Sequence, residues 1–162
     1  MLLNRLSYAF IIFGVSLFLI HCSKTSYDYP SYAITETEQL NIDDFILLAN
    51  QHRQNAGCNE NLIWDHSVHV VAQLHSLDMQ QNSYFSHKGL NGDQFWDRLA
   101  NYNVFYTAAA ENIAINSMQA SDVLQAWIDS PGHRANLENC IYTHHGVGLA
   151  SPGVWTHVFI RR

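Results

Sequence analysis

The order in which helical and strand patterns follow one another constrains the fold of this chain most. Apolar residues recur at helical spacing across residues 41–55 and again across residues 65–81. In the second segment they fall at i, i+3, i+4, i+7 and i+11 from Val68, and Asp65 precedes it as a natural N-cap. Each pattern gives the helix one apolar side, which must pack against another layer of the structure.

Shorter patterns follow these two helices, and the chain closes on strands. They comprise a helix around residues 95–99, a strand at 110–116, a helix at 122–129 and two strands at 146–150 and 154–160. Pro131-Gly132 is expected to end the helix before it and to place the following residues in a loop. Helices that precede strands, with one more helix between strands, predict an α+β domain built of layers.

Residues 1–22 are predicted to be an export leader. Arg5 supplies a positive charge, and residues 6–20 form an apolar run of the length typical of a signal peptide. A membrane-spanning helix needs about 20 apolar residues, and His21 and Cys22 end this run earlier. The protein is therefore expected to be exported, either to the cell envelope or as a secreted protein.

The end of this leader resembles the lipobox of bacterial lipoproteins, in which a cysteine is lipidated and becomes the new N-terminus. The sequence there is Leu19-Ile20-His21-Cys22, so Cys22 would carry the lipid and hold the protein at a membrane. A small residue normally precedes that cysteine, and His21 departs from this pattern. The alternative is a signal peptide that is cleaved without lipidation. Residues 23–39 are polar and predict a tether, and residues 40–162 form the folded domain.

The charge of the chain argues against one class of partner. The net charge is −6 at pH 7, and no stripe of Lys and Arg appears. Proteins that bind nucleic acids present such a basic stripe to the phosphate backbone. Nucleic acid is therefore not expected as a partner.

Two cysteines remain if Cys22 belongs to the leader. In an oxidising compartment Cys58 and Cys140 can form a disulfide, which would close a loop of about 80 residues. The alternative is a pair of buried free thiols.

The most specific signal comes from five segments in a fixed order. They are Ala72-Gln73-Leu74-His75-Ser76-Leu77-Asp78-Met79, Tyr84-Phe85-Ser86-His87, Glu111-Asn112-Ile113-Ala114, Trp127-Ile128-Asp129-Ser130-Pro131-Gly132-His133-Arg134-Ala135-Asn136, and Gly146-Val147-Gly148 with Trp155-Thr156. Together they resemble the CAP superfamily (SCP domain; cysteine-rich secretory proteins, antigen 5 and pathogenesis-related proteins), in particular its bacterial members. The resemblance implies an α-β-α sandwich with a cleft on one face.

The resemblance also implies which side chains line that cleft. It places His87 and Glu111 there, with His133 as a third member. Two imidazoles and one carboxylate are a ligand set for an open zinc site, and they can also transfer protons. Two departures weaken the match to plant and animal members, which carry a glutamate in place of Ser130 and a histidine in place of Val154. A structural role for Glu111, bonding a loop, is the alternative.

The other histidines have simpler interpretations. His75 lies on the apolar side of its helix and is expected in the core, with a hydrogen bond. His66 and His69 are expected to be exposed on the same helix, and His144 and His145 on a surface loop. Two arginines, Arg98 and Arg134, could each hold a loop through a carboxylate partner.

The sequence favours binding over catalysis. It contains no G-x-S-x-G, no H-E-x-x-H and no glycine-rich phosphate loop. The leading hypothesis is a non-catalytic binding protein; the resemblance to the CAP superfamily implies a lipid, a sterol or a protein as its ligand, and the His/Glu set adds a metal. The first alternative is a metal-dependent hydrolase in which zinc held by His87, Glu111 and His133 activates a water molecule. The second is an envelope protein whose cleft no longer functions.

Overall fold

The computed structural model describes residues 32–162. The predicted leader at residues 1–22, with Cys22, and residues 23–31 of the predicted tether lie outside the described residues. In the described part the chain order is α1 (Glu36–Asn55), β1 (Ile63–Trp64), α2 (His66–Gln81), α3 (Phe95–Asn101), β2 (Ala108–Ala114), α4 (Ala120–Asp129), α5 (Pro131–Leu137), β3 (His144–Ala150) and β4 (Val154–Arg161). None of these helices is both long enough and apolar enough to cross a bilayer.

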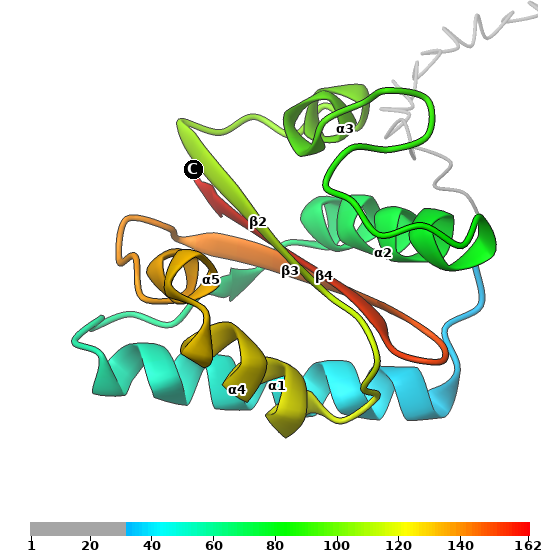
Figure 1. Ribbon diagram of the computed structural model, residues 1–162. Coiled ribbons are helices and arrows are strands. Elements are labelled where there is room, and N and C mark those ends of the chain that lie inside the picture. Colours follow the sequence, from blue (N-terminus) through cyan, green and yellow to red (C-terminus); the bar gives the residue numbers. More distant parts are fainter. Residues whose placement is uncertain (1–31) are drawn as a thin grey trace, which may run out of the picture. The chain divides into compact units, whose positions relative to one another are not determined.

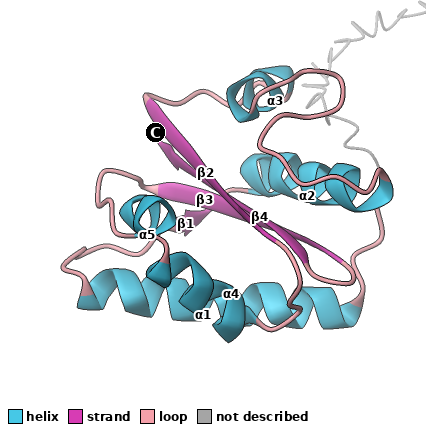
Figure 2. Cartoon of the chain, viewed as in Figure 1, coloured by secondary structure: helices cyan, strands magenta, loops and turns pink. Residues whose placement is uncertain are grey.

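The four strands form one sheet in the order β1-β3-β4-β2. The β3–β4 and β4–β2 pairs are antiparallel, and the short β1 runs parallel to β3. Helix α2 covers one face of the sheet, and α1 with α4 covers the other (Figure 1). The strands therefore lie between two helical layers (Figure 2), which confirms the α+β class and the α-β-α sandwich.

Both faces of the central strands are buried. Phe45, Trp127, Trp155 and Phe159 belong to the core between the sheet and α1 with α4. On the opposite face Val158 and Ile160 belong to the core with α2, together with Val68 and Val71. Side chains of successive strand residues point to opposite faces, so β4 contributes to both cores.

Helix α2 lies directly on β3 because two glycines leave room for its backbone. A Cβ atom at Gly146 would lie 2.1 Å from the nitrogen of His69, and one at Gly148 would lie 2.4 Å from the carbonyl carbon of Ala72. No larger residue fits at either position without moving the helix. The predicted start of this helix is confirmed, since the Asp65 carboxylate accepts hydrogen bonds from the N–H groups of Ser67 and Val68.

Helix α1 begins earlier than the sequence predicted. It begins at Glu36, because Thr35 and Glu38 form a capping box in which each side chain bonds the other residue's N–H. Residues 36–39, predicted as the end of the tether, are therefore helical. The Glu38 carboxylate also accepts hydrogen bonds from the N–H and hydroxyl of Ser151, which joins the start of α1 to the β3–β4 turn.

The prediction that Pro131-Gly132 leads into a loop was wrong. Ser130 is extended (φ −94°, ψ 116°) and ends α4, but Pro131 occupies the first turn of α5. Proline is well suited to that position because its nitrogen needs no hydrogen-bond acceptor there. His133 therefore lies on a helix.

Two surface predictions for histidines were also wrong. His69 is 6% exposed, and its Nδ1 donates a hydrogen bond of 2.7 Å to the carbonyl of Val147 on β3. His144 and His145 form the start of β3, and His145 is fully buried. His75 is 1% exposed and hydrogen-bonded, as predicted for a core histidine.

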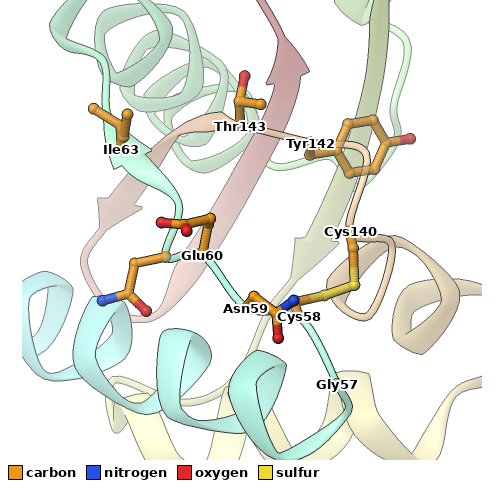
Figure 3. A pocket seen from close by; sticks show the side chains of 9 residues that line it. Gly57, Cys58, Asn59, Glu60, Ile63, Cys140, Tyr142 and Thr143 are labelled. Atoms are coloured by element: carbon orange, nitrogen blue, oxygen red, sulfur yellow. A yellow bond between two sulfur atoms is a disulfide. The ribbon is translucent and has the colours of Figure 1, made fainter.

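The predicted disulfide is present between Cys58 and Cys140, whose Cα atoms are 5.2 Å apart. It joins the loop after α1 to the loop after α5, as Figure 3 shows.

Candidate functional site

A buried carboxylate on β2 organises the candidate site. The Glu111 side chain is 1% exposed, and its two oxygens contact different partners. His87 Nδ1 lies 2.9 Å from Oε1, and Arg98 Nη2 donates to Oε2 at 2.6 Å. The ionised carboxylate accepts the Nδ1 proton, so the other ring nitrogen of His87, Nε2, is left as an acceptor.

The loop that carries His87 is held from two sides. Arg98 Nη1 donates to the carbonyls of His87 at 3.0 Å and of Asp93 at 3.2 Å. His75 Nε2 donates to the carbonyl of Ser86 at 2.9 Å. The expectation that Arg98 holds a loop through a carboxylate is therefore confirmed, with Glu111 as the partner. Both peptide groups that flank the Cα of His87 are fixed.

His133 reaches the same region from α5. The Asn112 side chain on β2 donates to the carbonyl of His133 at 3.0 Å, and the Asn136 side chain donates to Asn112 Oδ1 at 2.8 Å. These bonds hold α5 against the strand that carries Glu111. Burial lowers the pKa of His133, and the nearby ring of His87 lowers it further.

His87 and His133 line one cavity of about 370 Å³, which we call the His87–His133 cavity. Its other lining residues are Phe85, Ser86, Lys88, Gln94 and Ile113. Glu111 is buried next to it, bonded to His87. The sequence patterns do not predict Lys88 and Gln94 as site residues. The one signal for them is their closeness to His87 along the chain.

The donor set does not fit the zinc hypothesis. Both oxygens of Glu111 are already bound, one of them by the guanidinium of Arg98, whose positive charge opposes a metal ion at the same carboxylate. Within residues 32–162 no group of three or more His, Cys, Asp or Glu side chains is arranged to hold a metal. Zinc binding stays a prediction from the sequence, without support from this geometry.

Replacing Glu111 by Gln is expected to lower the free energy of unfolding by about 3 kcal/mol, because Arg98 would keep its charge in a site only 12% exposed. Chemical denaturation of Glu111→Gln against the unmodified protein measures this. The control is Glu60→Gln, at an exposed position. Equal stabilities of the two variants would contradict an ionised Glu111–Arg98 pair.

A larger hollow of about 610 Å³ lies beside the disulfide (Figure 3). Its lining runs from Gly57 to Asn61 and includes Ile63, Cys140, Tyr142 and Thr143. It contains none of the three predicted site residues, and Glu60 is its one charged side chain among the described residues. The His87–His133 cavity therefore remains the candidate site.

Comparison with known sequences gives the family. The sequence model of the Cysteine-rich secretory protein family, CAP, matches residues 47–160. The chain belongs to the CAP family. Among curated relatives of this CAP chain, the uncharacterized protein YkwD of Bacillus subtilis is 35% identical over 114 residues, which cover 70% of the chain and 44% of YkwD. The uncharacterized membrane protein YlbC of the same species is 41% identical over 101 residues, or 62% of the chain and 29% of YlbC. The chain thus spans less than half the length of either relative.

Solved structures agree with the CAP assignment. An extracellular protein containing a SCP domain from Bacillus anthracis superposes with a TM-score of 0.74 at 35% identity, over 82% of this chain and 45% of that one. An outer surface protein from Borrelia burgdorferi gives a TM-score of 0.69 over 80% of this chain and 96% of its own, at 19% identity. At that identity the second similarity shows the fold alone.

Proposed function

We propose that this CAP protein is an exported binding protein that takes the anionic group of a ligand into the His87–His133 cavity. The observation that carries the proposal is the charge of the lining. Lys88 is its one formally charged residue, two imidazoles accompany it, and no carboxylate is part of it. Arg98 compensates the charge of the buried Glu111. An anion therefore meets the positive charge of Lys88 and no opposing carboxylate in the lining.

The arrangement supports binding more than hydrolysis. Ser86 carries the one hydroxyl among the described lining residues, and its Oγ accepts a hydrogen bond from the N–H of Lys88 at 3.0 Å. An activated serine also donates its hydroxyl proton to a general base, and Ser86 forms no such bond within residues 32–162. His87 is the best oriented base, because Glu111 holds its Nδ1–H and leaves Nε2 as the acceptor, but no hydroxyl in the described part of the chain is bonded to Nε2. The geometry thus offers no prepared nucleophile for the proposed hydrolase.

Export is part of the proposal. It is supported by the signal-like residues 1–22 and by the extracellular description of the Bacillus anthracis relative, which is 35% identical. Lipidation of Cys22 would hold the binding domain at a membrane.

The proposal predicts that acetate and inorganic phosphate shift the NMR resonances of the His87 and His133 rings, whereas methylammonium does not. Because a bound anion stabilises the imidazolium form, binding takes up a proton. Affinity should therefore rise as pH falls from 7 to 5, by up to about tenfold per pH unit for one proton. Burial lowers the pKa of His133, so this ring takes up its proton at a lower pH than an ordinary imidazole.

Two variants and one control test the same site. Lys88→Gln and His133→Asn are each expected to weaken anion binding by about two- to fivefold, the usual effect of one partly exposed charge. His66→Asn, at an exposed position on α2, should leave it unchanged. If neither anion shifts the ring resonances of His87 and His133, or if all three variants bind the anions equally tightly, the proposed function is wrong.

A further inference from the structure

A second hollow adjoins the His87–His133 cavity. We call it the Ile115 groove; its volume is about 360 Å³. Its lining consists of Met79, Gln80, Ser83, Tyr84, Phe85, Ile115, Asn116, Pro152, Gly153 and Val154. None of these residues carries a charge or an imidazole. The groove therefore differs from its neighbour in chemistry, since the neighbour contains Lys88 and two histidines.

The two hollows meet at Phe85, which lines both of them and is 48% exposed. Their second shared border is the end of β2, where Ile113 lines one hollow and Ile115 the other. Each volume lies in or near the range of about 300–1,000 Å³ that is typical of small-ligand sites. One molecule can therefore occupy both by crossing the ring of Phe85.

The groove lining combines apolar side chains with neutral hydrogen-bonding groups. Phe85 and the 40% exposed Ile115 provide apolar surface. The side chains of Gln80, Ser83 and Asn116 are exposed and form no hydrogen bond with any other side chain or backbone group in residues 32–162. A pure alkyl chain would cover these amides and this hydroxyl without bonding them, which costs free energy. A peptide supplies both apolar side chains and backbone groups that can bond them.

We infer that the ligand is the carboxyl-terminal end of a peptide, with its α-carboxylate in the His87–His133 cavity and its last apolar residues in the Ile115 groove. The inference rests on the proposed function, because the carboxylate is the anionic group assigned to that cavity. The neutral lining of the groove offers no ionic partner to a charged side chain next to the carboxylate, so the preferred end is uncharged apart from its terminus.

The test compares three probes by calorimetry on the purified protein: N-acetyl-Ala-Leu as the free acid, the same dipeptide as its C-terminal amide, and octanoate. The free acid is expected to bind at least about tenfold more tightly than the amide, because the amide loses a charge-assisted hydrogen bond. It should also bind more tightly than octanoate, which cannot bond Gln80, Ser83 or Asn116.

Ile115→Asp places a carboxylate in the groove and is expected to weaken the free acid about tenfold and acetate by no more than about twofold, because only the dipeptide enters the groove. The matched control is Ile63→Asp, since Ile63 is 58% exposed and lines the hollow beside the disulfide. It should leave both affinities unchanged. Acetate binding that persists in Ile115→Asp also shows that this variant folds.

Each failure of this test has a distinct meaning. If acetate binds but the dipeptide acid binds no more tightly than acetate, the inference is wrong and the proposed function stands. If octanoate binds more tightly than the dipeptide acid, and if Ile115→Asp weakens the binding of octanoate, the occupant of the groove is an alkyl chain. This result also overturns the inference. If none of the anions binds, the proposed function fails and the inference fails with it.

Discussion

Replacing both Cys58 and Cys140 by Ala is expected to lower the free energy of unfolding by about 4.5 kcal/mol. The disulfide joins residues separated by 82 positions, and in the chain-entropy description a closed loop of this length restricts the unfolded chain by that amount. Domains of this size are stabilised by about 5–15 kcal/mol in total. The variant should therefore be close to half unfolded at 37 °C if the protein lies at the lower end of that range.

Urea denaturation followed by tryptophan fluorescence measures this loss. Unmodified protein treated with reductant should match the double variant, because both lack the same bond. This comparison works even if the variant folds poorly. A loss below about 1 kcal/mol in both samples would contradict the prediction.

Acid is expected to destabilise the protein steeply, because two histidines are buried next to each other. His145 Nδ1 lies 3.0 Å from His157 Nε2, and neither residue is exposed. Burial, followed by the charges of Arg53 and His144, lowers the pKa of His145 to about 3. Burial lowers the pKa of His157 well below its usual value, and His145 and Arg53 add to the effect. The rings of Phe45, Trp127 and Phe159 surround His157 and offer no compensation for a charge.

Stability falls with pH because the unfolded chain binds protons more readily than the folded protein does. In the unfolded chain both imidazoles take up protons near pH 6.5, whereas in the folded protein they stay neutral to a much lower pH. The stability contributed by the neutral pair is complete above pH 6.5 and is lost as pH falls toward the folded-state values. The expected loss is about 1.4 kcal/mol per pH unit for each imidazole, or about 3 kcal/mol for each ring between pH 6.5 and 4.

Urea denaturation at pH 7, 5.5 and 4.5 tests this slope. In His157→Gln it should flatten by about 1.4 kcal/mol per pH unit, because one titrating group is gone while an amide can still bond His145. His66→Gln changes an exposed histidine of α2 and should keep the slope of the unmodified protein. Equal slopes in all three proteins would show that the buried pair does not control acid stability.

The confirmed start of α2 depends on local chemistry, whereas the placement of the site residues depends on the family resemblance. Asp65 caps α2 because an aspartate before a periodic apolar segment bonds the first free N–H groups, whatever the rest of the fold. The placement of His87, Glu111 and His133 in one region came from the resemblance to the CAP family. His87 and Glu111 are hydrogen-bonded, and His133 lines the same cavity as His87.

The predictions that failed depend on tertiary structure. The His144-His145 doublet was assigned to a loop because two polar residues before a strand are typical of one. In fact β3 begins at His144 and lies between β1 and β4, with helices on both faces of the sheet. The side chains on both faces of this strand are therefore buried. A strand of this kind lacks the alternation of polar and apolar residues on which sequence reasoning relies. The hydrogen-bond partner of His145 is His157 on β4, 12 residues further along the chain. No pattern in the sequence indicates that these two side chains meet.

The two glycines under α2 also determine which parts of the protein can move to admit a ligand. Opposite Gly146 and Gly148 the backbone of α2 rests on β3 with no side chain between them, so the first half of the helix cannot tilt or slide without breaking this contact. The carboxylate of Glu111 projects from the same sheet. The sheet side of the site is therefore held in place, and within the segment of residues 82–94 it is the exposed side chain of Phe85, and not the hydrogen-bonded backbone around His87, that can move to admit a ligand. Binding kinetics should accordingly respond to changes in that segment and be insensitive to changes on the solvent side of α2.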